Sequence, residues 1–509
     1  MLKKRGAGVL MHISSLPSEY GIGVFDKNCL DFIDTLSAMK FGYWQVLPFN
    51  PVDDSNSPYC SSSAFAGNYL FIDPQALCDE GLCSQKEVDE NKYGGTPYTA
   101  DYDFAKEKRM ALLKSAFLNT DSSLAQKIRD FEKENEWLAD FSCFMALKEE
   151  NNFAPWWEWS EEYAHYDVFC EKHRRDFEEK CAFWKFVQYI FFTQWKKIKT
   201  YANEKGIAII GDMPIYVALD SADVWANTEQ FLIDEKTLKP QKVAGVPPDY
   251  FSADGQLWGN PLYDWSRMEL DGYSWWLKRI GMNLKTYNVV RIDHFRAFAS
   301  YWAIPADSET ARNGEWENGP KMKFFDRVFA KFPDAPIIAE DLGLFGEDVV
   351  KLLKDTGLPG MNVIQFAFDT GSDQSHLPHN AEKNSVSYVG THDNNTVLGW
   401  LWEAGEEERR FALDYIGFNG ADWGNGGYYS ESCRKMIEAV WKSSSNTAVV
   451  SFQDMCGFGS DARMNIPSVP EKNWRFRTTA ETVNALDKQY FRKINMLFRR
   501  NYDVFEKQN

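Results

Sequence analysis

The sequence lacks any long uninterrupted hydrophobic run. None of its 509 residues fall in a stretch approaching the roughly 20 consecutive apolar residues that a helix needs to cross a bilayer. The first residues, MLKKRGAGVLMHISSLPS, are basic and then apolar, but the apolar run from Ala7 to Met11 is short and His12 interrupts it. This differs from the apolar segment of a secretion signal. We therefore expect a soluble, cytoplasmic protein that does not insert into membranes.

An excess of positive charge is missing as well. Lys and Arg number 56 against 74 Asp and Glu, which gives a net charge of −18 and opposes binding to nucleic acid or anionic lipid. The nine cysteines form no CxxC pair, so neither a disulfide framework nor a zinc knuckle is expected. No glycine-rich phosphate fingerprint follows the first predicted strand, which argues against a dinucleotide-binding fold.

Aromatic residues, in contrast, are abundant, with 19 Trp, 23 Tyr and 37 Phe making 16% of the chain. One explanation is a large core with aromatic packing at its edges. Another is a groove for sugars, whose C–H faces stack on aromatic rings. Composition alone leaves both open.

Eight short apolar runs bounded by turn residues predict eight strands. They lie near residues 8, 43, 207, 289, 336, 362, 385 and 447, and helix-like stretches such as 28–41 separate most of them. Strands that are hydrophobic on both faces and alternate with helices are typical of a parallel sheet covered by helices. Eight of them favour an α/β protein with a closed (β/α)8 TIM barrel over an open doubly wound sheet.

The predicted strands are unevenly spaced along the chain. Residues 60–200 follow the second strand and exceed any ordinary loop, so they predict a mostly helical inserted subdomain. A second insertion, 216–288, contains the proline- and glycine-rich segment 243–265, VAGVPPDYFSADGQLWGNPLYDW, which we interpret as an active-site loop. Residues 1–509 are thus expected to form a single catalytic barrel with large insertions between strands.

The later predicted strands begin apolar and end in charged side chains. In such barrels the active site forms at the carboxyl ends of the strands. One aspartate there could simply cap the following helix, but Arg and His accompany the acids, which favours a shared catalytic mouth. The acidic side chains at these ends are Asp212, Asp293, Glu340, Asp341, Asp369, Asp393 and Asp454.

Two chemistries compete for such a mouth: carboxylates that hold Mg²⁺ beside a Lys or His base, or paired carboxylates that cleave a glycosidic bond. Arg291 favours the second. Alternation along the strand places it on the same face as Asp293, where its charge repels a divalent cation and is expected to lower the pKa of Asp293. No lysine stands at these strand ends. We therefore expect glycosidic chemistry and no metal.

The segments RIDHFRAF, IIAEDLG and VGTHDNNT resemble, in this order, the catalytic triplet of the α-amylase superfamily. Further motifs are similar to those of the amylomaltase branch of this superfamily, the 4-α-glucanotransferases. The motifs that carry this second resemblance are SSLPSEYGIG, SPY, GDMPIYVALDSADVW, segment 243–265 and ARMNIP. The likeness runs essentially from end to end. It implies no cofactor, and α-1,4-glucans and maltooligosaccharides as partners.

The resemblance also implies roles for individual residues. Asp293 would be the nucleophile that forms a covalent β-glucosyl-enzyme, and Glu340 the general acid that later acts as base. Asp393 would hold sugar hydroxyls and stabilise the oxocarbenium-like transition state, with the α configuration retained after two inversions. The implied substrate-binding residues are Tyr59, Asp212, Trp258, Arg291, His294, Asp369, His392 and Asn465.

Some of these binding assignments compete with structural roles. Asp212 could cap a helix, Asp369 could form a salt bridge, and Asn465 could fix a loop through a hydrogen bond. Tyr59 and Trp258 could be buried packing residues. For Arg296, which lies past the strand end, we predict only a structural salt bridge.

Transfer rather than hydrolysis requires that water be kept from the glycosyl-enzyme. Loop 247–260, with two prolines and with Tyr250, Phe251 and Trp258, is a candidate cover. An α-glucan hydrolase and a non-catalytic glucan-binding protein remain alternatives; the presence of all three carboxylates disfavours the second. Because the first strand begins at the N-terminus, we expect no starch-binding module and soluble donors. Oligomeric state and preferred donor length are not predicted.

Overall fold

The computed structural model describes residues 2–248, 253–343, 346–369, 371, 374–469 and 472–505. Its central sheet has eight parallel strands in the order β10-β11-β12-β1-β2-β3-β6-β9. They are β1 (Gly6–Leu10), β2 (Tyr43–Gln45), β3 (Ala208–Met213), β6 (Val289–Ile292), β9 (Ile337–Ala339), β10 (Gly360–Val363), β11 (Ser385–Tyr388) and β12 (Thr447–Ser451). Each of the eight predicted strands corresponds to one of them.

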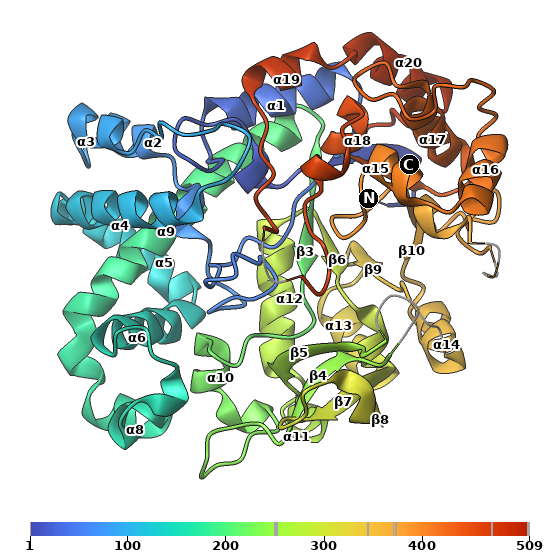
Figure 1. Ribbon diagram of the computed structural model, residues 1–509. Coiled ribbons are helices and arrows are strands. Elements are labelled where there is room, and N and C mark those ends of the chain that lie inside the picture. Colours follow the sequence, from blue (N-terminus) through green and yellow to red (C-terminus); the bar gives the residue numbers. More distant parts are fainter. Residues whose placement is uncertain are drawn as a thin grey trace.

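The two end strands, β9 and β10, meet and bring the sheet close to a full ring. The N–H of Ala339 donates to the carbonyl of Pro359 (2.9 Å). Next to this bond the Asp341 carboxylate accepts the N–H of Met361 (2.6 Å), so a side chain supplies a bond that a strand ladder would otherwise make. The prediction of a (β/α)8 barrel is confirmed (Figure 1).

Alternation along the strands divides their side chains between two cores. Val289 and Ile210 belong to the cluster inside the barrel, whereas Val290 and Ile292 pack in the larger cluster between strands and helices. Because successive side chains point to opposite faces, Arg291 follows Val289 on the inner face. The strand end that carries Arg291 and Asp293 is therefore a continuation of the barrel interior.

Helices cover the outside of the barrel, and most start at a capping side chain. Asp26, for example, accepts the N–H groups of Asn28 and Cys29 at the first turn of α1. The helices are α1 (Lys27–Ala38), α9 (Glu178–Glu204), α12 (Ser274–Thr286), α13 (Met322–Lys331), α14 (Glu347–Thr356), α15 (Val397–Glu403), α16 (Glu406–Tyr415), α17 (Glu431–Lys442), α18 (Phe452–Cys456), α19 (Ala480–Ala485) and α20 (Lys488–Leu497).

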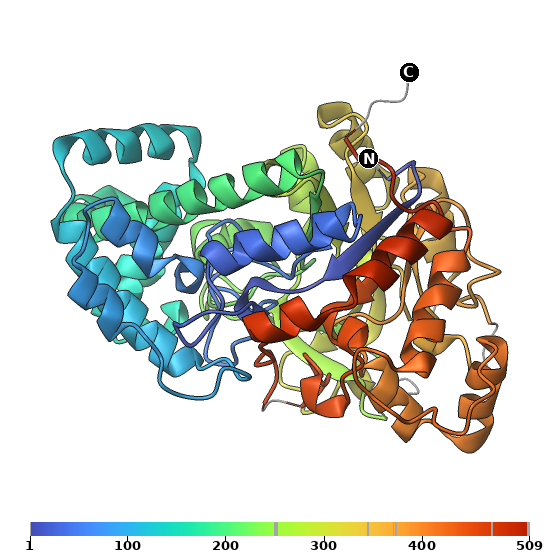
Figure 2. The ribbon, with the colours of Figure 1, turned by 90° about the horizontal axis from the view of Figure 1, so that it is seen from above.

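The stretch between β2 and β3 is mostly helical and lies to one side of the barrel (Figure 1). Before α9 it contains α2 (Pro74–Asp79), α3 (Gln85–Glu90), α4 (Tyr102–Leu118), α5 (Ser122–Glu134), α6 (Trp137–Glu150), α7 (Glu161–Ala164) and α8 (Tyr166–Lys172). Helix α9 leads back to the barrel and runs beside α1 (Figure 2), where the Tyr201 hydroxyl donates to the Asp34 carboxylate (2.9 Å).

A second, four-stranded antiparallel sheet lies at the lower edge of Figure 1, in the order β5-β4-β7-β8. Its strands are β4 (Lys242–Val246), β5 (Gln256–Pro261), β7 (Ser300–Pro305) and β8 (Glu315–Asn318), and the short helices α10 (Ala222–Ala226) and α11 (Trp265–Leu270) lie before and after β4 and β5. The sequence did not predict this sheet. It joins the segment before β6 to the segment after it, and so extends beyond residues 216–288.

Of the helices within the described ranges, none combines the length and the apolar character that crossing a bilayer demands.

Candidate active site

Strands β3 and β6 place Asp212 and Arg291 opposite each other, as directly paired residues of the parallel ladder. One guanidinium nitrogen of Arg291 donates to both oxygens of Asp212 at 2.7 Å. Asp212 is 1% exposed and Arg291 3%. A buried ion pair needs further hydrogen bonds to offset the loss of hydration. Here the Tyr59 hydroxyl donates to Asp212 (2.9 Å), and Arg291 also donates to Asp293 (3.0 Å).

The ionisation of Asp293 depends on burial more than on its arginine neighbour. Burial raises the pKa of Asp293, Arg291 lowers it and Asp212 raises it, and together they bring it to about 6. The net shift of this pKa is therefore upward. Arg291 acts in the predicted direction, but it is shared with Asp212 and cannot offset the desolvation of the carboxylate.

Glu340 lies at the end of β9, close to the end of β6. Its two carboxylate oxygens accept the N–H groups of His294 (2.6 Å) and Leu342 (2.9 Å). His294 adopts a left-handed conformation (φ 50°, ψ 50°), which costs free energy for a non-glycine residue. The N–H of this residue is the one that donates to Glu340. Burial raises the pKa of Glu340 to about 8, and the charge of Asp293 raises it as well.

Asp393 lies in the loop after β11, and three side chains hold it in place. The Nδ2 of Asn465 donates to its carboxylate (2.6 Å), His392 Nε2 lies 3.3 Å from its other oxygen, and Arg463 donates to its carbonyl oxygen (2.6 Å). Burial opposes ionisation, but His392 and the Asn465 hydrogen bond together lower the pKa of Asp393 to about 2. In turn burial opposes protonation of His392, but Asp393 raises its pKa.

Aromatic rings line the same region. The Tyr59 ring stacks on His392, with centroids 5.0 Å apart and an interplanar angle of 21°, and Trp474 lies against both rings. On the side of the second sheet, the ring of Trp258 meets His294 edge-on at 4.8 Å. Trp258 is 38% exposed. Tyr250 and Phe251, the other aromatic residues of the expected covering loop, lie outside the described residues.

Asp369 is placed differently from the other candidates. It is exposed, and its carboxylate accepts the N–H of Gly371 (2.9 Å). Glu408 of α16 lies close enough that Asp369 adds to the raising of its pKa by burial. The structure thus places Asp369 in a surface turn beside α16.

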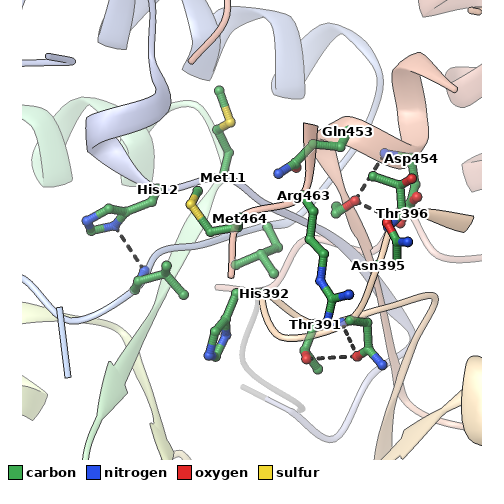
Figure 3. A pocket seen from close by; sticks show the side chains of 14 residues that line it. Met11, His12, Thr391, His392, Asn395, Thr396, Gln453, Asp454, Arg463 and Met464 are labelled. Atoms are coloured by element: carbon green, nitrogen blue, oxygen red, sulfur yellow. Dashed lines mark hydrogen bonds between the residues drawn. The ribbon is translucent and has the colours of Figure 1, made fainter. Parts of the chain in front are cut away.

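A pocket beside His392 completes this end of the barrel (Figure 3). Its wall includes His12, whose Nδ1 accepts the N–H of Leu47 (3.2 Å). Asp454 supports the opposite side, because it accepts the N–H of Val397 (2.7 Å) at the start of α15, directly after the loop that carries Asp393. The pocket is lined by Leu10, Met11, His12, Leu47, Thr391, His392, Asn394, Asn395, Thr396, Ser451, Gln453, Asp454, Arg463 and Met464.

Two residues of the site, Arg463 and Trp474, were not singled out from the sequence, and a third, Asp341, was named there only among the strand-end acids. Arg463 stands inside the ARMN motif, so its guanidinium was visible there as a possible partner for the strand-end acids. Trp474 gave no local signal, since its ring reaches Tyr59 only through tertiary folding. Asp341 follows Glu340 directly, and its task at the junction of β9 and β10 depends on the closure of the barrel.

The arrangement provides one carboxylate beside an arginine, one carboxyl group whose pKa favours the protonated form near neutral pH, and one carboxylate that stays ionised. Such a division of ionisation states among neighbouring acids suits acid–base chemistry at a glycosidic bond. Within the described ranges, His, Cys, Asp and Glu side chains form no group of three or more with the geometry of a metal site.

The sequence matches the family described as 4-alpha-glucanotransferase over residues 11–482. The 4-alpha-glucanotransferase of Clostridium butyricum is 44% identical over 473 residues, covering 92% of this chain and 95% of the relative. That of Aquifex aeolicus is 40% identical over 494 residues, covering 96% and 98%.

The fold has a solved counterpart in the amylomaltase from Streptococcus agalactiae in complex with acarbose. It is 36% identical, with a TM-score of 0.92, and the match covers 98% of this chain and 100% of that one. The Corynebacterium glutamicum amylomaltase, at 19% identity and a TM-score of 0.75, shares the fold. By its sequence over nearly its full length, the chain belongs to the 4-α-glucanotransferase family.

Proposed function

We propose that the chain transfers α-1,4-glucan segments from a donor maltooligosaccharide to an acceptor glucan or glucose by a retaining double displacement. Membership of the 4-α-glucanotransferase family supports the transferase activity. The mechanism rests on one observation: the two carboxyl groups come together at the end of β6, where Arg291 donates to Asp293 (3.0 Å) and Glu340 accepts the N–H of His294, the residue after Asp293 (2.6 Å).

In the first step the Asp293 carboxylate attacks the anomeric carbon while protonated Glu340 gives its proton to the departing glycosidic oxygen. This leaves a β-linked glycosyl-enzyme. In the second step ionised Glu340 takes the proton from an acceptor hydroxyl, whose oxygen attacks the same carbon and releases Asp293. Two inversions restore the α configuration. The pKa order, Glu340 above Asp293, supports this assignment of acid and nucleophile.

Asp393 is proposed to hold hydroxyls of the reacting sugar and to stabilise the positive charge that develops on its ring. The low pKa of Asp393 keeps the carboxylate ionised throughout the working pH range, and the bond from Asn465 fixes its direction. A preorganised negative charge of this kind stabilises an oxocarbenium-like transition state without reorganisation.

The remaining candidates are proposed to bind sugar or to position the acids. Tyr59 and Trp258 offer partly exposed rings, and neutral His294, whose pKa burial lowers to about 3, can hydrogen-bond a hydroxyl beside His392. Asp212 is fully covered, so we assign it to holding Arg291. Asp369 is exposed, and its proposed contact with sugar rests on the sequence resemblance alone.

The test that separates transfer from hydrolysis is the product pattern from maltotriose. A transferase forms glucose and longer maltooligosaccharides while the number of reducing ends stays constant. Rising reducing ends without longer products identify an α-glucan hydrolase, and binding without turnover identifies a glucan-binding protein.

The substrate class is supported by the likeness to the Streptococcus agalactiae amylomaltase, whose structure holds acarbose. A cytoplasmic location is proposed from the cysteines, because all nine are free thiols and reduced thiols are typical of the cytosol.

A further inference from the structure

A row of partly exposed apolar side chains crosses the second sheet. Leu257 pairs with Gly245, Gly245 with Trp302, and Trp302 with Trp316 on successive antiparallel strands. Directly paired residues point to the same face of a sheet, so Leu257, Trp302 and Trp316 share one face. Leu257 is 41% exposed and Trp316 44%. At Gly245, between Leu257 and Trp302, a Cβ would lie 2.2 Å from the carbonyl oxygen of Gln256, so this position of the row has no room for a side chain.

Leu257, Trp302 and Trp316 are called the aromatic row below, and its two tryptophan rings are held in place. The indole Nε1 of Trp302 donates to the Ala311 carbonyl (2.8 Å), and the rings of Trp302 and Trp316 meet edge to face at 5.1 Å. The Arg296 guanidinium lies 4.0 Å from the centre of the Trp316 ring, at a distance where a cation is attracted to the ring face. The row is therefore a preformed surface.

The aromatic row is joined to the catalytic mouth through the chain itself. Leu257 precedes Trp258, whose ring contacts His294 from the other face of the sheet. Arg296 stands two residues after His294, in the short helix η6 (Phe295–Phe298). The same strand and the same turn thus border the mouth on one side and the row on the other.

The chemistry of the row fits a neutral polyol better than a protein partner. Glu315 and Glu317 alternate with Trp316 along β8, so their carboxylates point to the opposite face, where both bond Lys242. Stable protein interfaces use about 20–30 residues on each side, far more than these three side chains. Sugar rings instead place C–H groups on indole faces and hydroxyls toward a guanidinium.

We propose that Leu257, Trp302 and Trp316 form a second binding surface for α-1,4-glucan, separate from the mouth, that holds long donor chains. The inference rests on the proposed function, because it assumes a glucan substrate. A chain long enough to touch both surfaces raises the effective concentration of its other end at the mouth. Maltotriose is too short to gain from this, so the surface selects for donor length.

The test compares Trp316→Ala with wild type on two donors, maltotriose and amylose. We expect kcat/KM on amylose to fall about fivefold, about 1 kcal/mol, and kcat/KM on maltotriose to stay within about twofold. Trp316→Phe, which keeps a flat ring, should retain most of the amylose activity. The matched control is Tyr429→Ala: Tyr429 is 74% exposed with Arg434 4.9 Å above its ring, and its loss should leave both donors unaffected.

Binding is measured separately in an Asp293→Asn background, by retardation in native gels that contain amylose; adding Trp316→Ala should reduce the retardation. Equal activity of wild type and Trp316→Ala on amylose, or equal loss on both donors, overturns the inference. So does a wild-type dimer that Trp316→Ala converts to a monomer in size-exclusion chromatography, because the row would then be a contact between copies. Failure of the wild type to elongate maltotriose would instead refute the proposed function.

Discussion

The ionisation of Asp293 and Glu340 predicts a bell-shaped pH dependence of catalysis. Burial raises the pKa of Asp293 to about 6 and that of Glu340 to about 8. In the proposed mechanism Asp293 attacks only as a carboxylate, so activity is lost as the pH falls through the lower value. As the proposed general acid, Glu340 must carry a proton for the leaving group, so activity is lost as the pH rises through the higher value.

These two values set the size of the effect. Treated as the two apparent pKa values of the pair, they leave roughly 80% of the enzyme with Asp293 ionised and Glu340 protonated at about pH 7. At about pH 5 and about pH 9 the fraction is roughly 10%. The value of kcat/KM for maltotriose should therefore fall about ninefold two pH units on either side of its maximum.

The assay measures initial glucose release from maltotriose at constant ionic strength, with circular dichroism on the same samples to verify that the protein stays folded. α-Maltosyl fluoride supplies the control donor, since fluoride departs without a proton from Glu340. With this donor the alkaline limb should disappear and the acidic limb should remain. A flat profile over the whole range, or an alkaline limb that persists with the fluoride, would refute the reasoning.

Substitutions at three positions extend the account. Asp293→Asn should lower turnover by more than about 1000-fold with an unchanged circular dichroism spectrum; substantial remaining activity would exclude Asp293 as nucleophile. Asp212→Asn removes a charge that raises the pKa of Asp293, so the acidic limb of the pH profile should move to lower pH, and urea unfolding should show a loss of about 3 kcal/mol; a limb that moves upward contradicts this. Asp341→Ala strands the buried N–H of Met361 and should cost about 2 kcal/mol in the same assay, whereas Asp341→Asn, which keeps an acceptor, should cost less.

The barrel strands could be predicted because their signal is local. Each is a short apolar run that ends at a turn, and inward and outward positions alternate within a few residues, which is how Arg291 and Asp293 were assigned to one face. The second sheet carries no such signal. β8 is largely exposed. β4 pairs with β7, which follows β6 in the sequence, so the second sheet forms only through tertiary contacts.

The candidate site divides in the same way. The positions of Asp293, Glu340 and Asp393 at strand ends follow from the fold class. The net pKa of Asp293 does not, because it depends on how deeply the carboxylate is buried and on Arg291 being shared with Asp212. Asp369 also ends a predicted strand segment, yet it is exposed and its carboxylate accepts the N–H of Gly371. β10 ends at Val363, and beyond the last paired residue the alternation along a strand no longer predicts where a side chain points.

The most direct test of the account is to trap the glycosyl-enzyme. The protein is incubated with a 5-fluoro-α-maltosyl fluoride, whose fluorine at C5 slows the second step, then digested with pepsin and analysed by mass spectrometry. We predict a glycosyl adduct on the peptide that contains Asp293, and its ester bond on that side chain. An adduct on any other residue, or turnover of the reagent with no adduct at all, would contradict the central claim that Asp293 forms the covalent intermediate.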